Sequence, residues 1–249
     1  MTPVVTTFSK DGYELYGKRM IETWLAYWPK SEYQLVVYVE DFELDEKDHG
    51  IIQRDIYECC PALIDFKKTS IEMIAKSPND GKYKKRIQKT VKWSHKVFVN
   101  HHAITHSDSD YLIFLDGDTY TTNDVPTKLA EELCGEDLLA VHFERLMQGL
   151  HFETGLLIFN LRHEQIEEFA KLYISGYHNL EIYNRPKTWD SFWLVHLYET
   201  YNLPIRNLSW KDTHEVFNNP IVKKILEHDV GPEKYKKLGY NRYTGRKTI

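Results

Sequence analysis

The pattern of apolar and polar positions predicts strands that alternate with helices. Residues 4–8 predict a first strand, and apolar residues then recur at helical spacing from Tyr13 until Pro29. Residues 34–39 are rich in β-branched side chains and predict a second strand. A strand, a helix and a strand with short connections form a βαβ unit, which implies a parallel sheet.

The rest of the chain continues this alternation. The pattern predicts a long basic helix, then three strands, then two helices, over residues 83–103, 111–115, 138–143, 154–161, 164–177 and 190–201. Residues 49–82 give no clear assignment apart from a turn near Gly81, and the chain becomes polar after Leu203. The sequence has no internal repeat and no low-complexity linker, so we expect a single compact domain.

Composition narrows the class of protein. A chain of 249 residues with 42% hydrophobic content fits one large α/β domain with a sizeable core. A net charge of −5 gives no reason to expect a stable nucleic-acid partner. The chain has neither a transmembrane-length apolar run nor a signal-peptide pattern, and its three cysteines match no zinc spacing. We therefore predict a cytoplasmic location with reduced thiols.

The most informative stretch is the apolar run 111–115, which is followed by Asp116 and Asp118. Such a run predicts a strand buried on both faces, and open α/β sheets bind their ligands at the carboxyl ends of strands. Two carboxylates one residue apart repel each other and are costly to bury without a cation between them. A hard divalent cation that also binds phosphate oxygens is the natural partner.

This apolar strand ending in Asp-x-Asp resembles the metal-binding motif of nucleotide-sugar glycosyltransferases with the GT-A fold. The resemblance implies an α/β, Rossmann-like single domain, with a mostly parallel central sheet flanked by helices and a C-terminal extension. Residues 1–125 would bind the nucleotide, residues 126–210 the sugar and acceptor, and residues 211–249 would close over the diphosphate. Asp116 and Asp118 would be metal ligands, and Gly117 between them would lie at the donor.

A second motif, His-x-x-Gly-x-x-Lys, spans residues 228–234. It is similar to the C-terminal motif of the retaining family that contains glycogenin and the lipopolysaccharide galactosyltransferases. By this resemblance His228 would be the third metal ligand, and Gly231 and Lys234 would face the diphosphate. The chain departs from the family pattern at Pro232 and in the Tyr-Lys pair that follows the lysine. The alternative is a surface histidine that precedes a Gly-Pro turn.

Two acidic residues are candidates for catalysis. Glu153 and Gly155 precede an apolar strand, as in the GT-A segment beneath the donor sugar, so Glu153 would contact the sugar and Gly155 would let the backbone pass close to it. Asp190 begins a predicted helix, where GT-A enzymes place an acid near the acceptor. Each has a structural alternative, since Glu153 can simply begin a strand and Asp190 can serve as a helix N-cap.

The nucleotide is expected at the end of the first strand. Thr6 and Thr7 lie where this fold class binds base and ribose, and Tyr13 or Tyr16 would stack on the base. The basic helix offers Arg86, Lys89, Lys92 and Lys96 to the diphosphate. A charged helix is most often a solvated face, so we expect only one or two of these residues, with Arg86 and Lys96 the candidates, to contact the donor.

The resemblance implies a hexosyltransferase of class EC 2.4 that uses Mn²⁺, or Mg²⁺, and a donor that is UDP-linked in the commonest case, with retention at the sugar. The acceptor would be a glycan, a lipid-linked glycan or a protein, and the basic C-terminal tail leaves open a peripheral position at a membrane. The sequence does not define the oligomeric state. A nucleotidyltransferase is the nearest alternative, but residues 6–12 lack its glycine-rich basic loop. A non-catalytic nucleotide-sugar-binding protein is the other.

Overall fold

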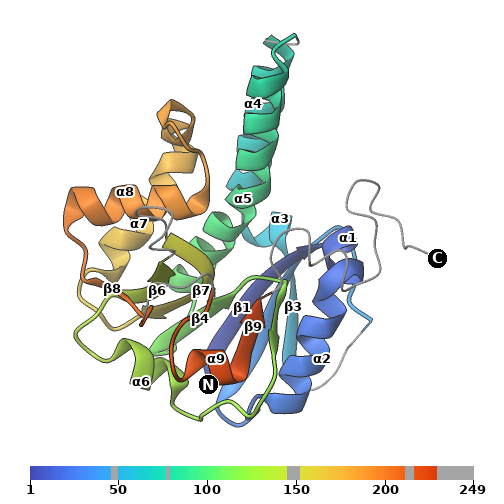
Figure 1. The fold of residues 1–249 in the computed structure, drawn as a ribbon. Helices are drawn as coiled ribbons and strands as arrows, with labels where there is room; N and C mark the ends of the chain where they lie inside the picture. The colour runs from blue at the N-terminus through green and yellow to red at the C-terminus, as the bar shows by residue number, and fades with distance from the viewer. Residues whose placement is uncertain (46–49, 77–78, 145–151, 211–215, 229–249) are drawn as a thin grey trace.

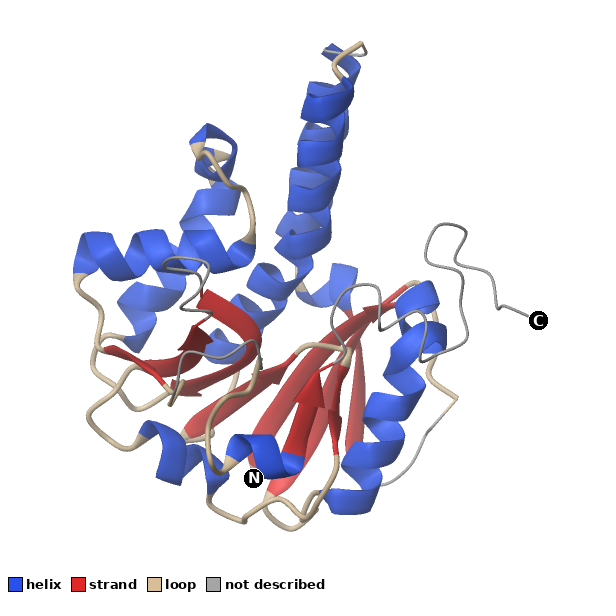
Figure 2. Cartoon of the chain, viewed as in Figure 1, coloured by secondary structure: helices blue, strands red, loops and turns tan. Residues whose placement is uncertain are grey.

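The computed structural model describes residues 1–45, 50–76, 79–144, 152–210 and 216–228. Within these residues the chain builds a seven-stranded sheet, whose strands in spatial order are β3 (Ile51–Asp55), β2 (Tyr33–Glu40), β1 (Thr2–Ser9), β4 (Tyr111–Leu115), β7 (Phe152–Asn160), β6 (Ala140–Glu144) and β8 (Ile205–Asn207). Only β7 runs against the others (Figure 2). The expected mostly parallel α/β sheet is confirmed.

Helices cover both faces of the sheet and make a three-layer domain (Figure 1). One face carries α1 (Lys10–Gly12), η1 (Tyr13–Gly17), α2 (Lys18–Tyr27), α6 (Leu129–Cys134) and α9 (Val222–Ile225). The other carries α3 (Ile56–Cys59), α4 (Pro61–Lys76), α5 (Gly81–Thr105), α7 (Ile166–His178), η2 (Glu181–Asn184) and α8 (Asp190–Tyr201).

Strand β4 shows why the sheet needs both helical layers. Leu112 and Phe114 pack in the core on the α5 side, whereas Ile113 and Leu115 pack in the core on the α2 side. Successive side chains of a strand point to opposite faces, so a continuous apolar run is buried only when both faces are covered. The two carboxylates that follow β4 therefore project from a rigid, fully buried strand.

The predicted elements lie within a few residues of the observed ones, apart from residues 49–82. That region holds β3, α3 and α4. The side chain of Asp55 caps α3 by accepting hydrogen bonds from the backbone N–H groups of Tyr57 and Glu58, at 2.7 and 3.0 Å. No helix among the described residues has both the length and the apolar character needed to cross a membrane.

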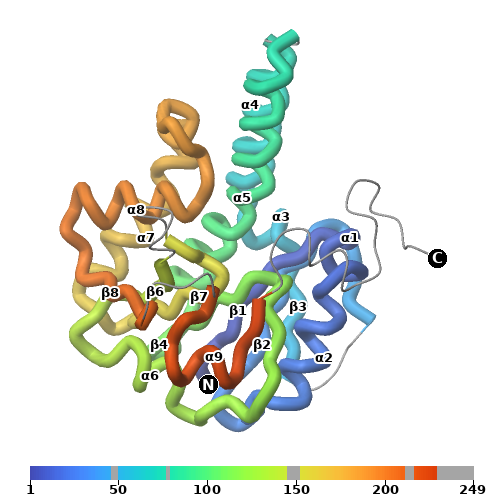
Figure 3. The backbone as a smooth tube through the Cα atoms, viewed as in Figure 1, coloured from blue at the N-terminus to red at the C-terminus, as the bar shows by residue number. Residues whose placement is uncertain are grey.

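Helices α4 and α5 form a hairpin whose far end rises away from the sheet (Figures 1 and 3). The base of α5 is buried, and Val97, Phe98 and Val99 lie in the core under the sheet. Most positions of residues 81–92 are exposed or half-buried. The hairpin is thus anchored at its base and extended into solvent at its tip.

A second, two-stranded sheet brings the end of the described chain back over β4. It pairs β5 (Thr119–Thr121) with β9 (Leu226–His228) in antiparallel register. The indole N–H of Trp28 donates to Thr121 Oγ1 at 2.8 Å and fixes β5 to the α2 layer. The Asp-x-Asp motif and His228, which are about a hundred residues apart in the sequence, therefore meet at the carboxyl end of β4.

Candidate active site

Asp116 and Asp118 lie in a tight turn between β4 and β5. The backbone N–H of Asp116 donates to the Gly155 carbonyl at 2.8 Å, and the Thr119 N–H donates to the Asp116 carbonyl at 2.9 Å. Gly117 fills the turn because a Cβ atom there would lie 2.5 Å from the ring of Phe8. The backbone thus holds both carboxylates at the carboxyl end of β4, next to β7.

His228 joins the two aspartates through the small sheet, where it pairs with Thr119. Its Nε2 atom lies 3.2 Å from Asp118 Oδ1 and 3.6 Å from Asp116 Oδ2. Neither ring nitrogen has a well-aligned hydrogen-bond partner within the described chain. Burial disfavours a charge on the ring, but the two carboxylates outweigh it and raise the pKa of His228 to about 10.

Glu153 brings a third carboxylate to this group. Ligand atoms of Asp116, Glu153 and His228 all lie within 4.8 Å of one another. Gly155 makes the approach possible, since a Cβ atom there would lie 3.1 Å from the His228 ring. The buried imidazole nitrogens and clustered oxygens fit a divalent cation such as Mn²⁺, and the sequence-derived ligands Asp116, Asp118 and His228 are brought together.

Lys96 links this group to Asp190. Its ammonium lies 2.8 Å from Asp116 Oδ1 and 3.3 Å from Asp190 Oδ2, and it donates to Thr154 Oγ1 at 2.9 Å. The Thr154 hydroxyl in turn donates to Asp190 Oδ2 at 2.6 Å. Burial disfavours the ammonium, but Asp116 and Asp190 raise the pKa of Lys96 above its usual value, so the group stays charged.

Thr154 had no predicted role, although the sequence places it between Glu153 and Gly155. Its side chain is 3% exposed and both receives and gives a hydrogen bond. Strand alternation sets Thr154 toward Lys96 and Asp190, while Glu153 has its carboxylate beside the Gly155 N–H, at 3.2 Å. The alternation of a strand was therefore the signal in the sequence that Thr154 faces the side of the strand opposite to Glu153.

Arg86 lies away from the cluster. It precedes Lys96 by ten residues on α5, which corresponds to about 15 Å along a helix axis. Its guanidinium donates to the Tyr183 carbonyl at 2.9 Å and to the Arg185 carbonyl. In this structure Arg86 ties α5 to the segment before α8, and its contact with the diphosphate stays a prediction.

The predicted nucleotide residues are buried or half-buried. Tyr13 is 1% exposed and packs against Phe8 and Phe42, whereas Tyr16, the other residue predicted to stack on the base, is half-buried. Thr6 is fully buried and Thr7 half-buried, and their hydroxyls have no hydrogen-bond partner among the residues that the structure describes. The predicted diphosphate contacts Gly231 and Lys234 fall outside those residues.

We expect the metal-free protein to lose stability as pH rises from about 6.5 to about 10. The folded-state pKa of His228 is about 10, above its ordinary 6.5. The stabilisation from its charge is therefore complete below pH 6.5 and is lost as the ring deprotonates in the folded state. Urea midpoints across this range would show the decline in the wild type and a shallower decline in His228→Gln. Parallel curves for the two proteins would contradict the assignment.

No protein-family model and no curated protein sequence matches this chain. Solved structures do match its fold. The chain is similar to mouse xyloside xylosyltransferase 1, with 11% identity, a TM-score of 0.55, and coverage of 92% of this chain and 97% of that one. It is also similar to the galactosyltransferase LgtC solved with donor and acceptor sugar analogues, with 14% identity, a TM-score of 0.52, and 95% coverage of both chains.

A third similar structure is the glycosyltransferase GlyE of Streptococcus pneumoniae. The identity is 12% and the TM-score 0.55, and the match covers 97% of this chain but 57% of GlyE. At these identities the likeness shows the fold alone. The protein has the GT-A glycosyltransferase fold, as the resemblance of its motifs predicted.

Proposed function

We propose that the protein is a metal-dependent glycosyltransferase that moves a sugar from a nucleoside-diphosphate donor to an acceptor. The proposed donor is a UDP-linked hexose. The proposed acceptor is a glycan, a lipid-linked glycan or a protein. The observation that carries the proposal is the convergence of Asp116, Asp118 and His228 at the carboxyl end of β4. Open α/β sheets bind ligands at this edge. The fold of the similar structures is that of enzymes with this class of reaction.

Mn²⁺, with Mg²⁺ as the alternative, is the proposed cofactor. Asp116, Asp118 and His228 would hold it, and Glu153 adds a further oxygen within reach. When bound, the cation supplies positive charge that stabilises a departing diphosphate. Mixed carboxylate and imidazole ligation suits manganese better than calcium. Lys234 is the proposed additional positive charge at the diphosphate.

Lys96, Thr154 and Asp190 hold the sugar side of the site in one arrangement. Two contacts, from the Lys96 ammonium and the Thr154 hydroxyl, engage one oxygen of Asp190. A carboxylate held in this way is suited to accept hydrogen bonds from sugar hydroxyls and to stabilise an oxocarbenium-like centre. We propose that Asp190 and Glu153 do this and that the configuration of the sugar is retained. The anomeric signal of the first product in NMR decides between retention and inversion.

We expect one nucleoside diphosphate, UDP in the first instance, to raise the melting temperature only when Mn²⁺ is present. A ligand at one hundred times its dissociation constant stabilises the folded state by about 2.7 kcal/mol. Differential scanning fluorimetry with a panel of nucleotides and nucleotide sugars, with and without Mn²⁺, measures this. A panel in which no nucleotide changes the melting temperature would refute the proposed donor site. An equal shift without metal would refute its metal dependence.

A further inference from the structure

Helix α5 carries a strongly basic exposed face. Among residues 81–105 there are seven lysine and arginine residues and no aspartate or glutamate, although the whole chain has a net charge of −5. Five of these side chains are exposed, namely those of Lys82, Lys84, Lys85, Lys89 and Lys92. Such a concentration of one sign on one element creates a local positive field that attracts anions.

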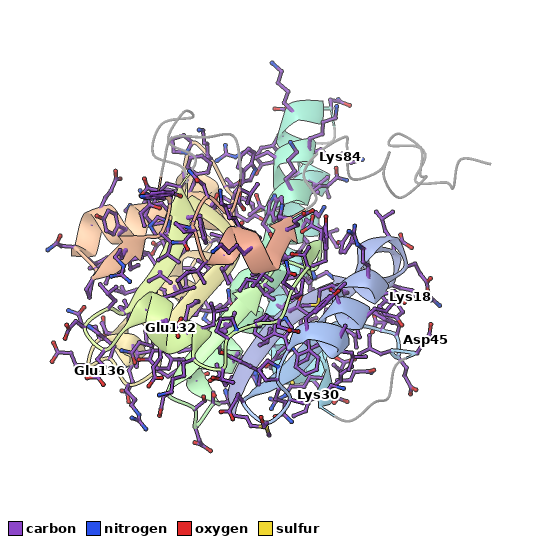
Figure 4. All side chains as sticks on the ribbon, turned by 60° about the horizontal axis from the view of Figure 1, so that its bottom comes forward. Lys18, Lys30, Asp45, Lys84, Glu132 and Glu136 are labelled. Atoms are coloured by element: carbon purple, nitrogen blue, oxygen red, sulfur yellow. The ribbon has the colours of Figure 1, made fainter. Side chains whose placement is uncertain are left out.

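This basic face leads directly to the candidate active site. Lys96, on the same helix, contacts Asp116 and Asp190. From Lys96 the helix runs outward along the projecting hairpin, and fourteen residues to Lys82 correspond to about 21 Å. Figure 4 labels Lys84 on the exposed part of this helix. The positive charges therefore extend from the site into solvent, over a length suited to an extended chain rather than to one small anion.

Aromatic rings lie beside these lysines close to the site. The Lys89 ammonium is 5.9 Å from the ring centroid of Trp189, the residue that precedes Asp190. Lys92 and Lys96 lie 5.4 and 5.5 Å from the ring of Trp93. Both tryptophans are half-buried, so part of each indole faces solvent. Flat apolar rings next to cations fit pyranose rings that carry negative groups.

We propose that the acceptor is an anionic glycan, with carboxylate or phosphate groups, which lies along Lys85, Lys89 and Lys92 and reaches Asp190 past Trp189. This assignment rests on the proposed glycosyltransferase function and names its acceptor class. A membrane surface fits this face less well, because interfacial helices bury an apolar face in the bilayer, whereas the exposed isoleucines of the hairpin, Ile64 and Ile71, lie on α4 and not on α5.

The test measures binding of a fluorescently labelled oligogalacturonide, with a neutral dextran oligomer of the same length as the control ligand. The variant Lys85→Gln/Lys89→Gln/Lys92→Gln is compared with Lys30→Gln/Lys171→Gln/Lys223→Gln, which removes three exposed lysines that lie outside α5. In Figure 4, Lys84 is labelled in the upper part of the view and Lys30 in the lower part. Because the α5 variant loses three exposed ion pairs with the glycan, and each such pair contributes little at a solvated surface, we expect about tenfold weaker binding.

The control variant should keep wild-type affinity, and Trp189→Ala should weaken oligogalacturonide binding severalfold. Equal affinity in both lysine variants would overturn the proposal. An affinity for oligogalacturonide that Trp189→Ala leaves unchanged would also overturn it. So would lysine-dependent binding to phosphatidylglycerol vesicles that is tighter than binding to the glycan. Metal-dependent stabilisation by nucleotide should be unchanged in the α5 variant. That result separates failure of the acceptor assignment from failure of the proposed function.

Discussion

Replacing Asp118 with alanine is expected to lower sugar transfer by roughly 10²–10³-fold or more, while the protein stays folded. Asp118 is close to His228, at 3.2 Å from its Nε2, but takes no part in the Lys96 ion pairs with Asp116 and Asp190. The substitution therefore removes a proposed metal ligand and one carboxylate beside His228, and leaves the Lys96 ion pairs with Asp116 and Asp190 in place. Turnover of a nucleotide sugar by hydrolysis or transfer, measured across Mn²⁺ concentrations, is the direct assay.

Asp124→Ala is a matched control, because Asp124 is an exposed acid a short distance along the chain, beyond β5. It should keep wild-type turnover and wild-type dependence on Mn²⁺. The Asp118 variant should also lose the nucleotide-induced rise in melting temperature. Wild-type turnover in a folded Asp118→Ala protein would remove the basis of the proposed mechanism, and so would an unchanged Mn²⁺ dependence.

Five of the seven strands of the main sheet were predictable because they carry their own evidence, whereas β3 and β8 were not predicted. The continuous apolar run of β4 requires cover on both faces, and the strand–helix–strand order at the N-terminus requires a parallel pair. The pairing of β5 with β9 was not predictable. Each strand has three residues, their separation in sequence is about one hundred residues, and short strands have no periodicity to recognise. Tertiary contacts such as the hydrogen bond from Trp28 to Thr121 determine it.

Within the site, the residues that the structure brings together are those whose chemistry is costly without a partner. Two acids one residue apart indicated a cation site, and the structure places them beside His228. Arg86 and Lys96 were equivalent in the sequence because both belong to a basic helix. The two residues differ in their surroundings. Lys96 is 5% exposed and lies between two carboxylates, whereas Arg86 lies nearer the N-terminus of α5 and donates to the Tyr183 carbonyl. A helical pattern shows which residues share a face, but not where along the helix the sheet ends.

Replacing Lys96 with methionine is expected to destabilise the metal-free protein by about 3–5 kcal/mol, which is the usual cost of removing one partner from a buried ion pair. Methionine keeps most of the apolar stem but leaves Asp116 and Asp190 without the ammonium that lies 2.8 and 3.3 Å from them. Chemical denaturation gives the free energy of unfolding. Lys84→Met is the control, because Lys84 is exposed on the same helix and its loss should change stability by about 0.5 kcal/mol or less.

A bound cation should partly replace the missing ammonium, because both stabilise the charge on Asp116. We therefore expect Mn²⁺ to raise the melting temperature of Lys96→Met by more than it raises that of the wild type. Asp190 lies on the other side of Lys96 and is not among the clustered ligand atoms, so the rescue should be incomplete. Equal Mn²⁺ shifts in the two proteins would show that the metal and Lys96 act on different carboxylates. A Lys96→Met protein as stable as the wild type would show that the buried network contributes nothing to the fold.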